Sequence, residues 1–348
     1  MKHTHLHTRL LALLLCCALV LPLSACGEAK STTQQIFAMD TVMDLTAYGK
    51  KADDGINAAI SIINSMDKLL DPENERSKTY EINHAMGSSV VVNEQIAKML
   101  RTALTVYERT NGAFDLTTYP LSKLWGFIDQ NYRVPSDAEI ERLLPCVDMS
   151  KVQLSATDDS ANSLVTIPAD MALSFGAVAK GCASDYAIQA MRAAGVTSGV
   201  VSLGGNVQTL GKKPDGSDWN IAIQDPNNTG SYLGYLTVGE TAVITSGSYQ
   251  RYFTEGGQKY HHILSPTTGR PVNNGLLAVT IVCEDGTLAD CLSTAMFVLG
   301  PQAALNYWRT YGGFEMLLVK TDGHVVLTNG LYGQFTPNGD SYVVDYAS

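Results

Sequence analysis

The hydrophobic pattern of the chain changes near Gly195, and this change constrains the fold more than any other feature. Before Gly195, apolar side chains recur at helical spacing, whereas after it short β-rich runs alternate with turn signals such as Asp322-Gly323. Helices are predicted at 53–70, 93–110, 178–195, 287–299 and 302–311. Strands are predicted at 199–203, 219–224, 232–238, 250–253, 260–264 and 277–283. Because strands and helices do not alternate regularly, the pattern predicts an α+β fold with largely antiparallel sheets and packed helices.

The N-terminus has the composition of an export signal. Lys2 and Arg9 precede the apolar run Leu10–Val20, and Leu23-Ser24-Ala25-Cys26 follows it. A membrane-spanning helix needs roughly 20 apolar residues, and this run is shorter. The pattern predicts a secretory signal with a lipobox, and the alternative is an ordinary secretory signal whose cysteine falls at the cleavage site by chance.

This signal predicts the domain organisation and the location of the protein. Residues 1–25 are expected to be removed as a lipoprotein signal peptide, which leaves a lipidated Cys26 as the first residue. Residues 26–35 are small and polar and are expected to form a lipid-anchored tether, followed by a single domain at 36–348. The protein is therefore expected on the extracytoplasmic face of a bacterial cell membrane, anchored through Cys26.

Charge and cysteine spacing argue against two kinds of site. The chain has 24 Lys+Arg against 34 Asp+Glu, a formal net charge of −10, so no nucleic-acid partner is expected, although a single nucleotide is allowed. Cys146, Cys182, Cys283 and Cys291 show neither CxxC nor CxxH spacing, so no zinc site is predicted. A disulfide stays open, and the four cysteines are otherwise interpreted as small buried apolar residues.

The segment Ser174–Asp185 places small residues before a predicted helix and Lys180 in its first turn. Free backbone N–H groups and the helix dipole at such a position favour a phosphate, so the segment is a candidate nucleotide site. The alternative is a tight loop packed on a helix, with Lys180 in solvent.

Asp290 and Thr294 are four residues apart on a predicted helix and therefore share one face. A carboxylate and a hydroxyl, completed by a backbone carbonyl, water and substrate phosphate, suit Mg²⁺. Spacing alone favours the alternative, a helix-capping Asp beside a threonine bonded to its own helix backbone.

His261 and His262 are adjacent in a predicted strand, which sends their side chains to opposite faces, so only one can face a given pocket. Histidine can act as a general acid or base near neutral pH, and the alternative is a hydrogen-bonded structural imidazole.

In order and spacing, these motifs resemble the ApbE family of flavin transferases over nearly all of the chain after Cys26. The matching positions are Met39-Asp40-Thr41, Asn111–Asp115, Gly176–Gly181 with Asp185, Leu203–Asn206, Trp219, Gln224–Pro226, Thr245–Gly247, Arg251, His261-His262, Pro266 with Thr268-Gly269, and Asp290 with Thr294. The resemblance implies an α+β fold related to the T-fold, with an FAD cleft between two lobes.

The resemblance also implies an enzyme, an FAD:protein FMN transferase. A threonine hydroxyl of an exported acceptor protein, such as a redox-pump subunit or another exported flavoprotein, attacks the FMN phosphorus of FAD, and AMP leaves. FAD is then the substrate and Mg²⁺ the cofactor, since such chemistry depends on charge neutralisation and positioning.

By the same resemblance, Asp290, Thr294 and the carbonyl of Ala177 hold the metal. The catalytic residues are His262, which deprotonates the acceptor threonine, Lys180 as a second counter-charge, and Asp290. The residues expected to contact FAD or to support its pocket are Met39, Thr41, Asp115, Lys180, Asp185, Leu203, Gly204, Gly205, Asn206, Ser246, Gly247, Arg251 and His262.

Two positions depart from the family pattern, because relatives commonly carry Asp where this chain has Ser174 and Ser248. In relatives, the segment that corresponds to residues 69–83 often supplies an aromatic contact to the flavin. In this chain Tyr80 is the only candidate for that contact. Two other functions stay open. A flavin-storage lipoprotein would need the cleft but not the metal ligands, and a metal-dependent FAD pyrophosphatase would use the same residues with water as the nucleophile.

Overall fold

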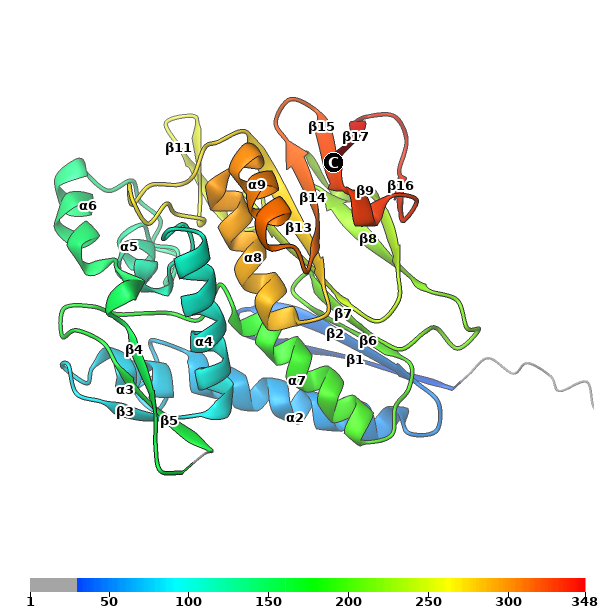
Figure 1. The fold of residues 1–348 in the computed structure, drawn as a ribbon, viewed down its shortest axis with the longest axis horizontal. Coiled ribbons are helices and arrows are strands. Elements are labelled where there is room, and N and C mark those ends of the chain that lie inside the picture. Colours follow the sequence, from blue (N-terminus) through cyan, green and yellow to red (C-terminus); the bar gives the residue numbers. More distant parts are fainter. Residues whose placement is uncertain (1–29, 160, 348) are drawn as a thin grey trace, which may run out of the picture. The chain divides into compact units, whose positions relative to one another are not determined.

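A nine-stranded sheet runs through the part of the chain that the computed structural model describes, residues 30–159 and 161–347 (Figure 1). Its strands, in spatial order, are β1 (Ser31–Ala38), β2 (Thr41–Tyr48), β6 (Gly199–Leu203), β7 (Asn206–Leu210), β10 (Ala242–Gly247), β13 (Leu276–Cys283), β14 (Glu315–Lys320), β15 (His324–Thr328) and β17 (Val343–Ala347). Neighbouring strands are antiparallel except β15 and β17, which are parallel. The α+β prediction with largely antiparallel sheets is thus confirmed.

The central strands of this sheet are buried on both faces. In β13, Val279 and Ile281 belong to one apolar core, while Ala278 belongs to a second core on the other face. In β14, Leu318 belongs to the first core and Leu317 to the second. Because side chains alternate along a strand, such strands read as continuous apolar runs.

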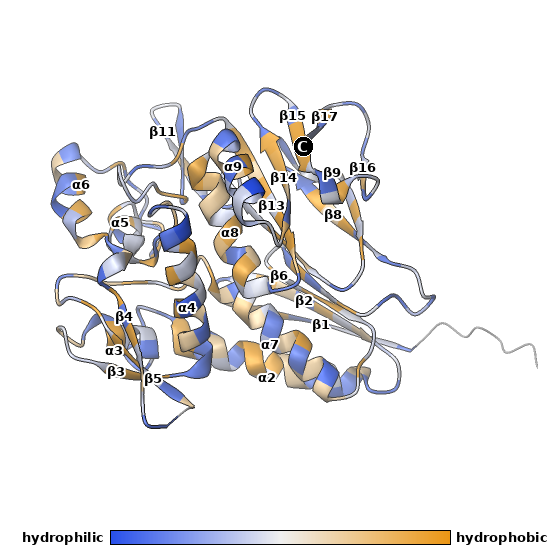
Figure 2. Cartoon of the chain, in the orientation of Figure 1, coloured by the Kyte–Doolittle hydropathy of each residue, from blue (hydrophilic) through white to orange (hydrophobic). Residues whose placement is uncertain are grey.

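Helices cover one face of the sheet. Helices α2 (Ala52–Leu70), α7 (Ala179–Ala193) and α8 (Gly286–Leu299) pack on β1 and β2, on β6 and β7, and on β10 and β13, respectively (Figure 1). Helices α4 (Glu94–Arg109) and α9 (Pro301–Tyr311) pack on α8. The bounds of these helices agree with the sequence prediction to within two residues. Figure 2 shows α8 as mainly apolar, as expected of a helix between a sheet and other helices.

A three-stranded sheet covers the opposite face. It consists of β16 (Phe335–Pro337), β9 (Asn228–Val238) and β8 (Trp219–Asp225) in that order. Its side chains Trp219, Leu236 and Phe335 pack with Leu317 and Val325 of the large sheet.

Short elements that the periodicity did not predict fill residues 70–170. They are helices α3 (Lys78–Asn83), α5 (Tyr119–Leu124) and α6 (Asp137–Leu143), and the small antiparallel sheet of β3 (Val90–Asn93), β5 (Asn162–Thr166) and β4 (Gln153–Ala156). A separate hairpin, β11 (Tyr252–Glu255) and β12 (Gln258–His261), lies between β10 and β13 in the chain.

Residues 31–35, which were predicted to belong to the tether, form part of a strand. This corrects the predicted end of the tether and start of the domain. Strand β1 begins at Ser31, and Thr33 and Thr46 share a 2.9 Å hydrogen bond across the β1–β2 pair. A polar sequence suits this position because β1 is an edge strand with an exposed face.

The predicted signal peptide and Cys26 lie outside the described residues. The chain divides into two units, Met1–Lys30 and Ser31–Ser348, and the second contains every strand and helix named above. In the described ranges, no helix combines the length and apolar character that a membrane span requires.

Candidate active site

Asp290 joins three segments that are far apart in the sequence. Its side chain lies on α8 and is only 3% exposed. One carboxylate oxygen accepts a 2.8 Å hydrogen bond from the backbone N–H of Gly181 in α7, and the other accepts a 2.9 Å bond from the Asn206 amide at the start of β7. A carboxylate has about four acceptor positions, so these two bonds leave room for a cation. The Asp290 carboxylate thus bonds to another helix rather than capping its own, which Asp285 does by accepting from Leu288.

Helices α7 and α8 approach closely at Gly181. A Cβ there would lie 2.1 Å from the carbonyl oxygen of Gly286 and 2.6 Å from Cβ of Asp290. Any larger residue would push the helices apart. The glycine in this motif therefore serves helix packing, and its N–H is taken by a carboxylate of the protein. Lys180 and Ala177, the latter just before α7, are partly exposed on either side of Val178 and Ala179.

Thr294 lies one helical turn beyond Asp290 and faces β10. Its hydroxyl is 3.2 Å from the Ser246 hydroxyl, which is 2.8 Å from that of Ser293. Gly247 follows Ser246, and a Cβ on it would lie 2.4 Å from the Tyr249 ring. The fold therefore brings the predicted pair Asp290 and Thr294 on α8 together with the predicted pair Ser246-Gly247 on β10.

Two tight turns place the remaining predicted cleft residues on the same edge of the sheet. The β1–β2 turn has positive φ at Met39 (49°), and the β6–β7 turn has positive φ at Gly204 (61°) and Gly205 (92°). A Cβ on Gly204 would lie 2.5 Å from the Thr41 hydroxyl, so the two turns are in contact. The buried Leu203 pairs with Met43 of β2 and leads into this second turn. Asn206 follows directly and donates to Asp290, which links the turns to α8.

Asp185 is a structural anchor with a saturated carboxylate. It accepts from the backbone N–H groups of Gly286 (2.8 Å) and Thr287 (3.0 Å), from the Thr287 hydroxyl (2.6 Å) and from Gln208 (3.1 Å). Lys98, which sequence reasoning missed, adds an ion pair at 2.7 Å. Asp185 therefore supports the site by holding the start of α8, as the expected hydrogen-bonding role requires.

His262 has the tautomer that a general base needs. Strand β12 ends at His261, before the predicted end at Leu264, so His262 lies just beyond the strand, although its backbone N–H still donates to the Arg251 carbonyl at 3.0 Å. Its Nδ1 lies 3.2 Å from the same carbonyl, which can only accept, so Nδ1 carries the proton and Nε2 is free to accept one. Burial, and then the nearby charge of Arg251, hold the pKa of His262 well below its usual range, and Lys180 acts in the same direction. The imidazole is therefore neutral at pH 7.

His261 is a structural histidine. It is buried, with Nε2 2.8 Å from the Val272 carbonyl, and its Nδ1 accepts from the backbone N–H of Ile263 at 3.3 Å. Its ring also makes an edge contact with Phe297 at 5.6 Å between centroids. Both ring nitrogens are satisfied, so this imidazole has no free group to offer a ligand.

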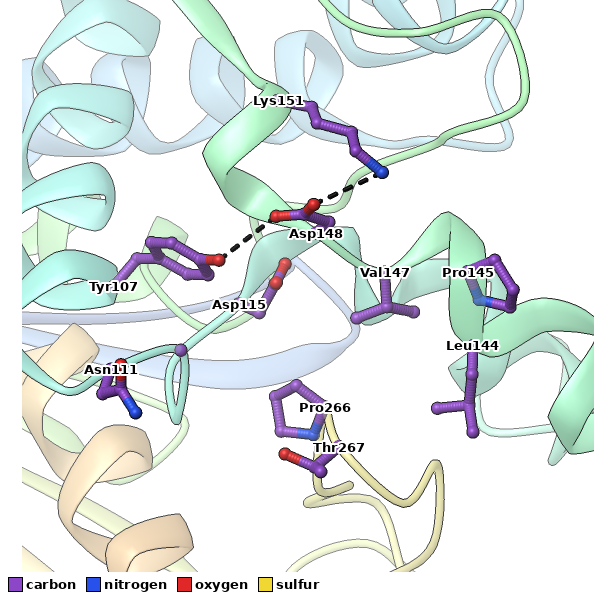
Figure 3. Close-up of a pocket in the computed structure, with 11 residues that line it drawn as sticks. Tyr107, Asn111, Asp115, Leu144, Pro145, Val147, Asp148, Lys151, Pro266 and Thr267 are labelled. Atoms are coloured by element: carbon purple, nitrogen blue, oxygen red, sulfur yellow. Dashed lines mark hydrogen bonds and ion pairs between the residues drawn. The ribbon is translucent and has the colours of Figure 1, made fainter.

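Asp115 lines a cavity of about 550 Å³ (Figure 3). It lies at the wall of that cavity, opposite the loop that carries Pro266 and Thr267. Its carboxylate accepts from the N–H and hydroxyl of Thr117 and from the N–H of Met149, and burial raises its pKa. The full lining is Tyr107, Asn111, Gly112, Asp115, Leu144, Pro145, Val147, Asp148, Lys151, Pro266 and Thr267. These bonds tie Asp115 to Thr117 and to the backbone at Met149.

The donor set around Asp290 suits a hard cation. In residues 30–159 and 161–347 no three His, Cys, Asp or Glu side chains gather as a metal cluster. The groups that the structure places at this part of α8 are the Asp290 carboxylate and the hydroxyls of Ser246, Ser293 and Thr294. Such an oxygen set fits Mg²⁺, which keeps several waters and takes phosphate oxygens as further ligands.

Sequence reasoning missed an aromatic cluster beside His262. Phe127 makes an edge contact with the His262 ring at 6.4 Å, and Phe253 stacks on Tyr132 and on Tyr260, each at 5.3 Å. Phe253 and Tyr260 are cross-strand partners, so recognising the β11–β12 hairpin would have paired them. Tyr80, the candidate flavin contact, instead stacks on His84 at 3.7 Å in another cavity.

The fold and these contacts define a class of protein. It is an α+β protein in which a buried carboxylate on α8 shares a helix face with a threonine hydroxyl, and in which a neutral histidine on another segment has a free Nε2. The sequence matches the ApbE family over residues 39–318, and the chain belongs to that family. The resemblance found in the sequence is thereby confirmed.

Curated relatives and solved structures agree with this assignment. The chain is 29% identical over 326 residues to the FAD:protein FMN transferase of Treponema pallidum, with 88% of this chain and 90% of that protein covered. It is 30% identical over 285 residues to a protein of the same name from Klebsiella pneumoniae, covering 81% and 87%. The ApbE protein of Thermotoga maritima superimposes with a TM-score of 0.81 at 30% identity, covering 88% of this chain and 100% of that one. The apo flavinyl transferase ApbE of Pseudomonas stutzeri gives 0.75 at 27% identity, covering 89% and 98%.

Proposed function

We propose that the protein is an FAD:protein FMN transferase, which moves FMN from FAD to a threonine of an exported acceptor protein and releases AMP. The observation that carries this proposal is the Asp290 carboxylate, held by Gly181 and Asn206 beside the Thr294 hydroxyl, in a member of the ApbE family. Relatives that cover most of the chain bear the name of this activity.

The residues of the chain have separate tasks in this reaction. Nε2 of His262 takes the proton of the acceptor threonine as its oxygen bonds to the FMN phosphorus and the bond from that phosphorus to AMP breaks. Lys180 offers a positive charge to the pyrophosphate. Asp290, Thr294 and the Ala177 carbonyl hold Mg²⁺, which neutralises charge on the pyrophosphate. Met39, Thr41, Leu203–Asn206 and Ser246-Gly247 form the FAD cleft, and Arg251 borders it through its contact with His262.

The direct test is incubation of residues 27–348 with FAD, Mg²⁺ and a candidate acceptor, followed by intact-mass and nucleotide analysis. We expect AMP in solution and the mass of one FMN on an acceptor threonine. AMP with free FMN would instead indicate an FAD pyrophosphatase, and intact FAD retained by the protein would indicate flavin storage. An acceptor with the threonine replaced by valine is the matched control.

The lipid anchor is part of the same proposal, because the protein that accepts FMN in the proposed reaction is exported. The lipobox ending at Cys26 supports attachment to the extracytoplasmic face of the membrane. We expect Cys26→Ser to move the protein from the membrane fraction to the soluble fraction without loss of transferase activity. Equal partitioning of mutant and parent would rule out the anchor.

A further inference from the structure

The ammonium group of Lys98 lies between three helices. Lys98 extends from α4 to Asp185 of α7, at 2.7 Å, and to Asp285 at the start of α8, at 3.5 Å. Its side chain is 25% exposed and that of Asp185 only 6%, so this is a largely buried ion pair rather than a surface one. Burial alone would lower the pKa of Lys98, but the Asp185 carboxylate raises it overall, so the ammonium stays charged.

The two carboxylates that Lys98 contacts are the caps of α8. Asp185 accepts from the N–H groups of Gly286 and Thr287, and Asp285 accepts from the N–H of Leu288 at 2.9 Å. Together they bind the free N–H groups of the first helical turn. Two carboxylates close to one cation repel each other, and the Lys98 ammonium, in contact with both, offsets that repulsion at the helix end.

Asp290 lies about one turn beyond these caps. Helix α8 begins at Gly286, and a helical turn contains about 3.6 residues, so a tilt or fraying of the first turn displaces the Asp290 carboxylate directly. Figure 1 shows α4, α7 and α8 in contact along this part of the fold. Gly181 packs closely on α8, so a movement of α8 would break the hydrogen bond from the Gly181 N–H to Asp290.

We propose that Lys98 is a positioning residue for the Asp290 site, acting through Asp185 and Asp285 on the first turn of α8. This inference takes the role of Asp290 from the proposed function, whereas the contacts of Lys98 with Asp185 and Asp285 are independent of that proposal. Groups that hold a metal ligand without touching the metal typically change metal affinity or activity by 10- to 100-fold when removed. A purely structural ion pair would instead affect stability and leave metal affinity unchanged.

The test compares Lys98→Met with Arg101→Met. Arg101 is on the same helix and forms an exposed ion pair with Glu94, so its loss controls for removal of a cation from α4. Three quantities are measured: Mn²⁺ affinity by electron paramagnetic resonance with ADP present, hydrogen exchange of the Gly286 and Thr287 amides, and the Mg²⁺ dependence of FMN transfer. ADP is used because it is the half of FAD that carries a pyrophosphate.

For Lys98→Met we expect about 10- to 100-fold weaker Mn²⁺ binding, faster exchange of both amides and a matching rise in the Mg²⁺ needed for transfer. Lys98→Arg, which keeps the charge, should recover most of each effect. Mn²⁺ affinity and amide exchange equal to those of Arg101→Met would overturn the inference, whatever happens to the melting temperature. If Lys98→Met does not fold, Lys98→Gln is judged by the same measurements. Absence of FMN transfer by the parent protein would refute the proposed function, whereas amide exchange would still decide the role of Lys98.

Discussion

Replacing Asp290 with alanine is expected to lower FMN transfer by at least about 10²- to 10³-fold while leaving much of the FAD affinity. Only interactions that strengthen in the transition state raise the rate, and the negative charge that a cation held by Asp290 would neutralise develops as AMP departs. In the proposed site, contacts to the flavin and the adenine come from other residues and should retain much of the affinity. Titration of FAD into the mutant, together with the transfer rate at saturating FAD and Mg²⁺, separates the two effects.

The structure adds a stability cost that must be distinguished from catalysis. Alanine at position 290 leaves the Gly181 N–H and the Asn206 amide without their acceptor, and an unsatisfied buried polar group costs about 1–3 kcal/mol. Asp290→Asn keeps the volume, removes the charge and retains one of the two accepting oxygens, so it should lose transfer with a smaller fall in melting temperature than alanine causes. Asp218→Asn, at an exposed ion pair with Lys212, is the matched control. Normal turnover of Asp290→Asn with Mg²⁺ would exclude Asp290 from the metal site.

The sequence predicted the parts of the fold that depend on local periodicity. Helices α2, α4, α7, α8 and α9 have long apolar faces, and their bounds were predicted closely. Apart from α4, the elements between 70 and 170 were not predicted, because α3, α5 and α6 have six or seven residues each and β3 pairs with β5 about 70 residues away. Such short segments are stabilised by packing rather than by their own pattern.

The site residues were predicted by resemblance, but their contacts were not. That Asp290 accepts from Gly181 follows only once α7 and α8 are known to cross at a glycine. The role of Lys98 was invisible because its partners come from two other helices. The two departures also have a local explanation, since the Ser174 hydroxyl accepts from the N–H of Gly176 at 3.2 Å and the Ser248 hydroxyl lies 3.3 Å from the Leu277 carbonyl. Each serine therefore makes a hydrogen bond of its own at a position where the family pattern was expected to carry Asp.

The two adjacent histidines should respond to mutation in different ways. His262→Ala is expected to lose about 10²- to 10⁴-fold in transfer rate while still binding FAD and metal, because a positioned general base contributes about that much. His261→Ala should chiefly lower stability, since it removes the partner of the Val272 carbonyl and of the Ile263 N–H. Thermal unfolding and single-turnover transfer, measured on both mutants, make the comparison. Equal loss of transfer in the two, at equal stability, would reduce His262 to a residue that lines the pocket.

The pH dependence gives an independent check on His262, and here the structure changes the expectation. A solvent-exposed histidine acting as the base would give an acidic limb near its ordinary pKa, about 6.5. Burial and the charges of Arg251 and Lys180 lower the pKa of His262, so the free enzyme keeps its base unprotonated at pH values where a solvent-exposed histidine would be charged. Because kcat/KM reports ionisations of the free enzyme, its acidic limb should lie well below pH 6.5 in the parent and vanish in His262→Ala. Removing the Arg251 charge, as in Arg251→Met, weakens the cause of the shift and should move the limb upward. A limb at pH 6.5 that persists in His262→Ala would belong to another group and would leave the metal and substrate positioning as the whole of the mechanism.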